Sequence, residues 1–360
     1  MNVVKSTKRF EQWLHRHTQV VEADLRLKHE RMAESPFIFL RATFYRWMQR
    51  WPKICPRLTK APKVLAVGDL HVENFGTWRD KEGRLIWGVN DFDEAYPLAY
   101  TNDLVRLAVS AVLAVQESRL SLSGKTACEA IIKGYTQTLR EGGRPFVLGE
   151  HNRWLRLIAH GELRDPVHFW TKMDALPPAK GSIPASAIEA LEHLMPESGL
   201  KYKLVRRVAG LGSLGHQRLV GICDWRGGRI ARETKALVPS ACFWANESDG
   251  PPEIQYQTLI TCAVRCPDPF VQLRGHWIVR RLAPDCSRIE LAALPVARDE
   301  LKLLEAMGAE TANIHLGTAG ATSRILRHLG KQEQGWLSGA VKEASAAVEE
   351  DWRDWKKEAS

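Results

Sequence analysis

The stretch from residue 63 to residue 94 constrains the fold more than any other part of this sequence. KVLAVGDL (63–70) has the continuous apolar character of a buried strand and then runs into a turn. Residues 75–78 and 84–89 predict the two strands of a hairpin, because the residues between them are charged and end in glycine. We therefore expect a strand, a loop and a hairpin in close succession.

Polar side chains should gather at the open end of this hairpin. Its turn centres near residue 82, and paired positions of an antiparallel hairpin lie at equal distances from the turn. Asn74 is therefore expected to face Asn90, with Asp91 beside it and Asp69 one short loop earlier. Oxygen-bearing groups would then converge at one end of a sheet.

Such a cluster suits a hard cation. Mg²⁺ takes oxygen ligands, commonly one or two carboxylates completed by waters and substrate phosphates, and clustered carboxylates without a cation would repel one another. The simpler alternative is that these Asp and Asn residues only cap turns, and for any one of them this alternative remains open. The clustering of the whole set favours a functional site.

The composition limits the class of protein. The chain has 360 residues, 44% of them hydrophobic, which is enough for a large core and too apolar for a disordered chain. Seven scattered cysteines do not make a disulfide scaffold, and neither a signal peptide nor a membrane span is evident. We expect a cytoplasmic protein without a membrane partner. The net charge of +9 favours anionic partners such as nucleic acid or phosphorylated molecules.

A second pattern begins near residue 201. The sequence there alternates, is rich in β-branched residues and is punctuated by glycine, which predicts three strands joined by a glycine-rich turn and then a tighter turn. A helix is expected over 253–264, a further strand over 276–283, and helices from about 297 onward. Residues 101–119 predict a buried helix, because nearly all of them are apolar. The predicted fold class is therefore α+β.

Three motifs carry a resemblance to a known superfamily. GDLHVEN (68–74), NDFDEA (90–95) and NDLVRLA (102–108) resemble the catalytic loop, the metal loop and the following helix of the aminoglycoside-phosphotransferase and protein-kinase-like superfamily. The sequence is still more similar to DUF2252, a bacterial family of uncharacterised, kinase-related proteins. SPFIFLRATF (35–44) and the helical region around 312–315 extend this resemblance over most of the chain.

The resemblance implies roles for individual residues. Asp69 resembles the catalytic-loop aspartate that orients or deprotonates an acceptor hydroxyl. Asn74 resembles the asparagine that binds Mg²⁺ from that loop, and Asp91 resembles the metal-binding aspartate of the next loop. Asp93 is a candidate for an additional metal ligand.

Two more residues are expected to support the site. Asp103 opens the apolar helix and resembles the buried aspartate that braces the backbone of the catalytic loop. His71 lies within that loop, and we expect it to shape the loop rather than to take part in chemistry.

Gly210, Gly212 and Gly215 form a G-x-G-x-x-G motif. A dinucleotide-binding fold would need a helix directly after these glycines, whereas a strand-like run follows here. In a glycine-rich hairpin, backbone N–H groups, including that of Ser213, can approach phosphate oxygens. Lys235 falls on the next strand, where a kinase lysine reaches the phosphates. The alternative is a plain glycine turn and a solvated lysine.

The order of these elements is reversed relative to ordinary kinases, in which the glycine-rich loop precedes the catalytic loop. The resemblance therefore implies a circularly permuted, two-lobed, protein-kinase-like fold, and permutation is tolerated because domain termini often lie close together. We expect a helix-rich catalytic lobe over residues 1–198 and a small antiparallel-sheet, nucleotide-binding lobe over residues 199–292. Helices in residues 293–360 should pack back on the catalytic lobe.

Two departures from the family pattern concern Lys235. The family's strand lysine is usually followed directly by a glutamate, but Ala236 follows here, and the nearby acid is Glu233. The helical residue that should pair with the lysine is not obvious either, and Glu253 is a candidate. The charge partner of Lys235 therefore stays open at this point.

The function that best fits these features is an ATP- and Mg²⁺-dependent phosphotransferase acting on the hydroxyl of a small molecule or a protein. Phosphoryl transfer needs positioning and charge neutralisation, which these residue types supply. The alternatives are nucleotide binding without transfer, or adenylyl transfer. A metallophosphoesterase would need further ligand motifs that the sequence lacks, and a basic nucleic-acid-binding protein would need a nucleic-acid motif that is not found.

Overall fold

The structure is a computed structural model that describes residues 1–117, 120–149, 151–159, 165–247, 251–286 and 297–359. The helices that precede the five-stranded sheet are α1 (Val3–His15), α2 (Glu22–Met32), α3 (Pro36–Ala42), α4 (Phe44–Ile54), the 3-10 helix η1 (Leu58–Lys60), α5 (Tyr100–Gln116), α6 (Gly124–Glu141), α7 (Arg153–Ala159), α8 (Pro166–Asp174) and α9 (Ala185–His193). The later helices are α10 (Ala241–Ala245), α11 (Tyr256–Cys262), α12 (Ala297–His315), α13 (Ala321–Leu329) and α14 (Trp336–Ala359). The strands are β1 (Lys63–Ala66), β2 (Phe75–Arg79), β3 (Leu85–Val89), β4 (Tyr96–Ala99), β5 (Phe146–Val147), β6 (Lys203–Arg206), β7 (Arg218–Trp225), β8 (Gly228–Ala236), β9 (Gln272–Arg274) and β10 (Trp277–Leu282).

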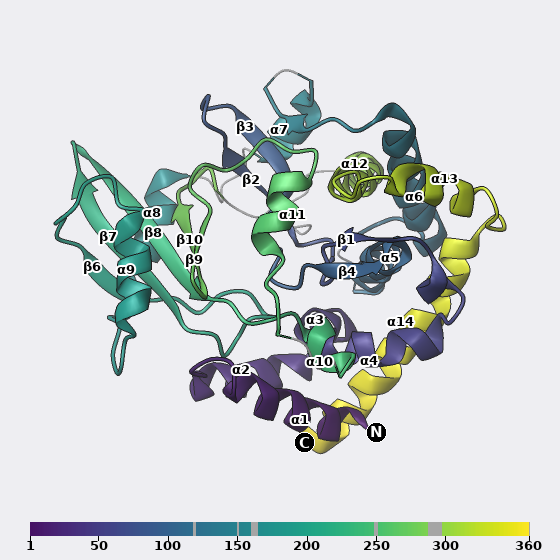
Figure 1. The fold of residues 1–360 in the computed structure, drawn as a ribbon, viewed down its shortest axis with the longest axis horizontal. Helices are drawn as coiled ribbons and strands as arrows, with labels where there is room; N and C mark the ends of the chain where they lie inside the picture. The colour runs from purple at the N-terminus through teal and green to yellow at the C-terminus, as the bar shows by residue number, and fades with distance from the viewer. Residues whose placement is uncertain (118–119, 150, 160–164, 248–250, 287–296, 360) are drawn as a thin grey trace.

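The described strands pair in antiparallel sheets. Strand β1 pairs with β4, strands β2, β3 and β5 form a second sheet, and the largest sheet has the order β6-β7-β8-β10-β9. Figure 1 shows this largest sheet at one end of the molecule, with most of the helices at the other end. The expected α+β class is confirmed.

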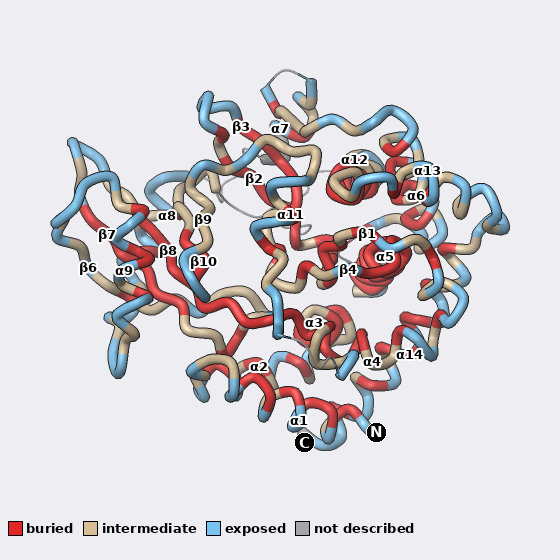
Figure 2. The backbone as a smooth tube through the Cα atoms, in the orientation of Figure 1, coloured by how far each residue is buried: buried red, intermediate tan, exposed pale blue. Residues whose placement is uncertain are grey.

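Helix α5 forms the centre of the helical part. Nearly all of its residues are buried, as its apolar sequence predicts, and helices α6, α12 and α14 pack around it. Figure 2 shows its backbone buried along most of its length. Two charged residues, Asp103 and Arg106, are fully buried with it. The helix ends at Gln116, and the last two residues of the stretch expected to be helical, 118–119, lie outside the described residues.

Strands β2 and β3 form the expected hairpin with the expected register. Phe75 pairs with Val89, and the backbone N–H of Asn90 donates to the Asn74 carbonyl at 3.0 Å. The buried carboxylate of Asp80 holds the turn, because it accepts hydrogen bonds from two backbone N–H groups within it. Asn74 and Asn90 therefore mark the open end of the hairpin, as the sequence predicts.

The three strands expected after residue 201 are β6, β7 and β8. The tight turn between β7 and β8 contains Arg226 (φ 46°) and Gly227 (φ 80°), and two positive φ angles match the twist that such hairpins favour. Apolar side chains of α9 pack on one face of the sheet, and Met173 of α8 packs on the other. The end of the expected sheet lobe, residues 287–292, lies outside the described residues.

The two ends of the chain lie side by side (Figure 1). Helix α14 packs against α1, α2, α3 and α4. Arg46 and Asp351 form a buried ion pair with hydrogen bonds of 2.9 and 2.8 Å, and Trp355 Nε1 donates to the His29 carbonyl at 3.2 Å. Among the described residues, no helix is both long enough and apolar enough to cross a membrane.

Candidate functional site

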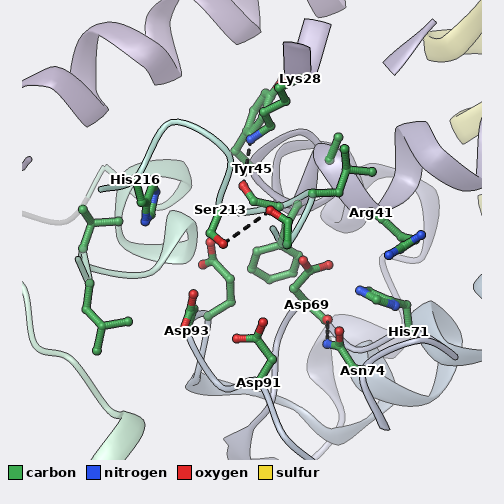
Figure 3. A pocket seen from close by; sticks show the side chains of 18 of the residues that line it. Lys28, Arg41, Tyr45, Asp69, His71, Asn74, Asp91, Asp93, Ser213 and His216 are labelled. Carbon is green, nitrogen blue, oxygen red and sulfur yellow. Dashed lines mark hydrogen bonds between the residues drawn. The ribbon is translucent and has the colours of Figure 1, made fainter. Parts of the chain in front are cut away.

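One pocket brings together three loops (Figure 3). They are the first acidic loop (68–74), the second acidic loop (90–95), and the glycine-rich turn between β6 and β7. The pocket encloses about 60 Å³, which holds a few water molecules but not a nucleotide. The residues expected at the site that line the pocket are Asp69, His71, Asn74, Asp91, Asp93, Gly210, Gly212 and Ser213. Lys235, Asp103 and Gly215 are not among the lining residues, but Lys235 pairs with Asp93, which is.

Asp103 braces the loop that carries Asp69. Its fully buried carboxylate accepts hydrogen bonds from the backbone N–H groups of Val67 (2.7 Å) and Gly68 (3.0 Å). His315 Nε2 lies 3.1 Å from the same carboxylate, so α12 also contacts this support. Asp103 thus holds the backbone of this loop.

Asp69 is held by an arginine of the apolar helix α5. Arg106 donates to Asp69 Oδ1 through Nε at 2.9 Å and also through Nη2, which donates as well to the Leu40 carbonyl at 2.8 Å. The Arg106 guanidinium is buried against the rings of Phe44 and Trp47. Burial raises the pKa of Asp69 above its usual value, although Arg106 opposes the shift. A fixed carboxylate with a raised pKa suits the orientation and deprotonation of a hydroxyl.

Asn74 and His71 shape the loop that follows Asp69. Asn74 Nδ2 donates to the Asp69 carbonyl at 2.6 Å, and the Asn74 backbone N–H donates to the His71 carbonyl at 2.9 Å. The backbone N–H of Glu73 donates to His71 Nδ1 at 3.2 Å. Because the amide nitrogen of Asn74 is engaged by the loop, its Oδ1 atom is the one that a cation would take.

Lys235 lies beside two carboxylates of the second acidic loop. Its buried ammonium pairs with Asp93 Oδ2 and lies 3.8 Å from Asp91 Oδ1. Burial and the neighbouring Asp91 raise the pKa of Asp93 to about 6, although Lys235 opposes the shift. Glu253, the candidate partner from the sequence, is exposed ahead of α11. The partner of Lys235, which the sequence leaves open, is therefore Asp93 of the second acidic loop and not the candidate Glu253.

The donor set at this point fits a hard cation. Asp93 Oδ1 and Asn90 Oδ1 are buried oxygens that have no hydrogen-bond partner within the described chain, and orphaned acceptors of this kind are uncommon. Asp93 lines the pocket together with Asn74 and Asp91, and these three side chains offer the oxygen ligands that Mg²⁺ takes, whereas Asn90 lines a neighbouring cavity. The described residues contain no group of three His, Cys, Asp or Glu side chains spaced to hold a metal. Lys235 occupies Asp93 Oδ2, so a cation bound by that oxygen would compete with the ammonium.

The glycine-rich turn closes over Asp69. A Cβ atom at Gly212 would lie 3.2 Å from Asp69 Oδ2 and 3.3 Å from the Arg41 carbonyl, so a larger residue would push these groups apart. Ser213 Oγ accepts a hydrogen bond from Arg218 Nη2 at 3.0 Å, which ties the turn to the sheet. The turn therefore covers the carboxylate of Asp69.

The sequence does not reveal that helix α2 holds this turn. Lys28 of α2 is buried, and its Nζ donates to the Gly212 carbonyl at 2.8 Å (Figure 3). The backbone N–H of Val21 donates to the Gly215 carbonyl at 2.8 Å, and a Cβ atom at Gly215 would lie 2.7 Å from Leu25. Burial lowers the pKa of Lys28. No sequence signal separates Lys28 from the other charged residues of α2.

Glu233 has a role separate from that of Lys235. Its fully buried carboxylate accepts hydrogen bonds from Arg207 (2.6 Å), Arg218 (2.8 Å) and Arg280 (2.8 Å). Burial alone would raise the pKa of Glu233, but the three guanidinium groups hold it well below its usual value. Glu233 thus anchors three arginines on the face of the sheet that carries Lys235.

Comparison with known proteins finds a family match for the segment that carries the acidic loops. Residues 19–159 match the model of DUF2252, whose members are described as uncharacterized proteins conserved in bacteria. The matched segment contains α2, both acidic loops and α5, and it ends before the glycine-rich turn. Neither a curated protein nor a solved structure matches the chain.

Proposed function

We propose that this protein, whose residues 19–159 match the DUF2252 family, is an ATP- and Mg²⁺-dependent phosphotransferase with a circularly permuted, two-lobed, kinase-like fold. One observation carries the proposal: the acidic loops and the glycine-rich turn, which lie far apart in the sequence, line the same pocket, and Lys235 pairs with the second acidic loop there. Protein kinases combine a glycine-rich loop over the phosphates, a lysine on the third strand, and an asparagine and an aspartate for Mg²⁺. Lys235 lies on β8, the third strand along the chain in its sheet.

Each side chain has a defined role in this proposal. Asp69 orients the acceptor hydroxyl and takes up its proton as the oxygen attacks phosphorus. Asn74, Asp91 and Asp93 would hold Mg²⁺, which when bound neutralises charge on the phosphates. The backbone N–H groups of the glycine-rich turn and the ammonium of Lys235 would bind phosphate oxygens.

The arrangement of the chain ends supports the permuted order. The N- and C-termini lie side by side, and α14 packs against α1 (Figure 1). Neighbouring termini are what allow a fold to be opened at one loop and joined at another. The helices after the sheet pack on the part that carries the acidic loops, since α12 contacts α5 and α6.

A thermal-shift measurement with ATP, with and without Mg²⁺, tests the proposal. A ligand that binds only the native state raises Tm, so Mg²⁺-ATP should raise Tm of the wild type and of Asp69→Asn. The shift should be lost in Asp91→Asn, which removes one charge from the cation site. No shift of the wild type at millimolar Mg²⁺-ATP would refute nucleotide binding altogether.

The reaction itself is tested by the mass of the product. Phosphoryl transfer adds a phosphate group to the acceptor and releases ADP, whereas adenylyl transfer adds AMP and releases pyrophosphate. Small-molecule extracts and proteins incubated with isotopically labelled ATP would distinguish the two reactions, and the acceptor class follows from which fraction carries the label. Asp69→Asn is the matched control, because it keeps the cation ligands and loses the proposed proton acceptor.

A further inference from the structure

A second cavity lies on the other side of the glycine-rich turn. It encloses about 500 Å³, within the range of small-molecule sites of about 300–1,000 Å³. Gly210 lines both this cavity and the smaller pocket, and Asn90, next to Asp91, also lines the larger one. The glycine-rich turn therefore borders both spaces, and the second acidic loop lies beside both.

The larger cavity is strongly basic. The basic residues that line it in the described part of the chain are Lys172, Arg207, Arg218, Arg265, Arg280 and Arg281. The only acidic residue among its described lining is Asp268. A cavity with this excess of positive charge attracts an anion, because the surrounding protein screens the charges less than water does.

The arginines are held in place before any ligand binds. Glu233 fixes Arg207, Arg218 and Arg280 together, which leaves two positive charges in excess of that single carboxylate. The guanidinium of Arg265 lies 4.6 Å from the centre of the Trp78 ring, and that of Arg281 lies 4.2 Å from the centre of the Phe270 ring. Preorganised donors lose little conformational freedom when they bind.

Some of these donors have no hydrogen-bond partner among the described residues. Arg265 Nη1 and the Nε and Nη2 atoms of Arg281 are buried and have no hydrogen-bond partner within the described residues. Buried donors are normally satisfied, so such atoms mark a place where a ligand or water supplies the acceptor. Planar guanidinium groups match the oxygens of a phosphate in pairs.

We propose that this cavity binds a chain of linked phosphate groups. Two sources have this chemistry: the triphosphate of the nucleotide itself, or an acceptor that already carries phosphates. The proposal that phosphates bind here is argued from the arginines of the cavity alone. Only the link between this binding and catalysis rests on the proposed function. Arg218 makes that link, because it donates to Glu233 on the cavity side and to Ser213 Oγ in the glycine-rich turn.

Calorimetric titration of the full chain with inorganic tripolyphosphate, without metal, tests the site. Arg281→Gln and Arg207→Gln should each weaken binding by about tenfold or more, the effect of losing one charge-assisted hydrogen bond. Arg226→Gln is the matched control, because the substitution removes the same charge from the same sheet at a side chain that is 74% exposed in the β7–β8 turn. Its binding should change less than about twofold. A wild type that does not bind millimolar tripolyphosphate, or cavity variants that bind like Arg226→Gln, would overturn the proposal.

Competition then identifies the source. Displacement of tripolyphosphate by ATP but not by AMP assigns the site to the nucleotide's triphosphate. Simultaneous binding of ATP and tripolyphosphate assigns it to a phosphorylated acceptor, and both outcomes support a phosphate site. Asp91→Asn should still bind tripolyphosphate when it no longer responds to Mg²⁺-ATP. A failure of the proposed function would thus leave this binding intact.

Discussion

The ammonium of Lys28 on α2 donates a hydrogen bond of 2.8 Å to the backbone carbonyl of Gly212. This contact joins the N-terminal helices to the turn that covers Asp69. Two more contacts lie beside it: the Val21 N–H donates to the Gly215 carbonyl, and Asp24 pairs with Arg206 at the end of β6. The position of the glycine-rich turn therefore depends on helix α2, which lies near the N-terminus of the chain.

Replacing Lys28 by methionine should loosen the glycine-rich turn. The variant keeps an unbranched side chain but leaves the Gly212 carbonyl without its donor, and a lost hydrogen bond to a charged group costs about 1.5–3 kcal/mol. Hydrogen exchange of the peptide that contains residues 210–216 should therefore become faster, while exchange in α5 stays the same. Lys125→Met, at an exposed position of α6, is the control. Equal exchange in both variants would show that Lys28 does not hold the turn.

A side chain at Gly212 should impair the site more than the fold. The added methyl group of Gly212→Ala would meet Asp69 Oδ2 at 3.2 Å and the Arg41 carbonyl at 3.3 Å, so the turn must move by a few tenths of an ångström. We expect Mg²⁺-ATP binding and turnover to fall about tenfold or more, because small displacements of reacting groups are costly. The free energy of unfolding should change by less than about 1 kcal/mol.

The matched control for Gly212→Ala is Gly228→Ala. Gly228 opens β8, and the nearest atom to an added Cβ there is the Trp225 carbonyl oxygen at 4.0 Å. Nucleotide binding by Gly228→Ala should equal that of the wild type in the same titration. If the two substitutions affect nucleotide binding equally, the glycine-rich turn is not part of the nucleotide site.

Removing the Lys235 ammonium should change metal and nucleotide binding in opposite directions. In the structure the ammonium neutralises Asp93 and lies 3.8 Å from Asp91, so it competes with a cation for these carboxylates. Lys235→Met should bind Mg²⁺ alone about tenfold more tightly or better, because a charge at this distance is worth several kcal/mol at the screening typical of proteins. The same variant should bind ATP more weakly, since it lacks a phosphate ligand.

Titration calorimetry with Mg²⁺ and, separately, with Mg²⁺-ATP measures both effects of Lys235→Met. Lys201→Met, at an exposed position ahead of β6, controls for the change in net charge. If Lys235→Met and Lys201→Met bind Mg²⁺ equally, Asp91 and Asp93 are not the cation ligands.

Asp103→Ala should destabilise the fold strongly. The substitution leaves the buried N–H groups of Val67 and Gly68 without acceptors, and each unsatisfied buried group costs about 1–3 kcal/mol. We expect the free energy of unfolding in urea to fall by about 3 kcal/mol or more. Asp354→Ala, on the exposed side of α14, should change it by less than about 0.5 kcal/mol. A loss as small as that of Asp354→Ala would show that the loop does not need its brace.

Glu310 should make stability depend on pH. This carboxyl group is buried beneath β3, where it accepts a hydrogen bond from the Val89 N–H at 3.3 Å. Burial raises its pKa from 4.5 to about 7. Between pH 4.5 and pH 7, Glu310 is therefore protonated in the native chain but ionised in the unfolded chain. The stability that this proton contributes is complete below pH 4.5 and is lost as the pH rises through 7.

Urea unfolding of Glu310→Gln at about pH 5 and about pH 8 measures this contribution. A shift of this size corresponds to roughly 3 kcal/mol, so the wild type should lose up to that much stability relative to Glu310→Gln between the two pH values. Glu129→Gln, at an exposed position of α6, should show the same pH dependence as the wild type. If Glu310→Gln also follows the wild type at both pH values, Glu310 does not titrate in this range.

The hairpin and the glycine-rich turn are predictable from the sequence because short-range rules determine them. The register of β2 and β3 follows from the position of a charged turn and from the alternation of side chains in strands. The strand-like run after Gly215 distinguishes a glycine-rich hairpin from a glycine turn that starts a helix. Both features depend on residues within a few positions of one another.

The charge partners are not predictable in this way. Lys235 pairs with Asp93 because the tertiary fold brings β8 to the second acidic loop, 142 positions away in the sequence. The residues around Lys235 and Glu253 in the sequence do not indicate this contact. Arg106 does carry a signal, since an arginine within an otherwise apolar helix implies a buried partner, but the signal does not say that the partner is Asp69. Lys28 lies on a helix with many charged residues and carries no signal at all.

Helix α12 leaves the ribosome long after the loop that it supports. Asp103 and the Asp69 loop are synthesised early, whereas His315, which contacts the Asp103 carboxylate, comes more than two hundred residues later, at a separation of 212 positions. During that interval the acidic side chains have neither α12 nor the basic strands of the sheet around them. A chain that has not yet reached residue 315 therefore carries the acids of the site without the contacts that position them.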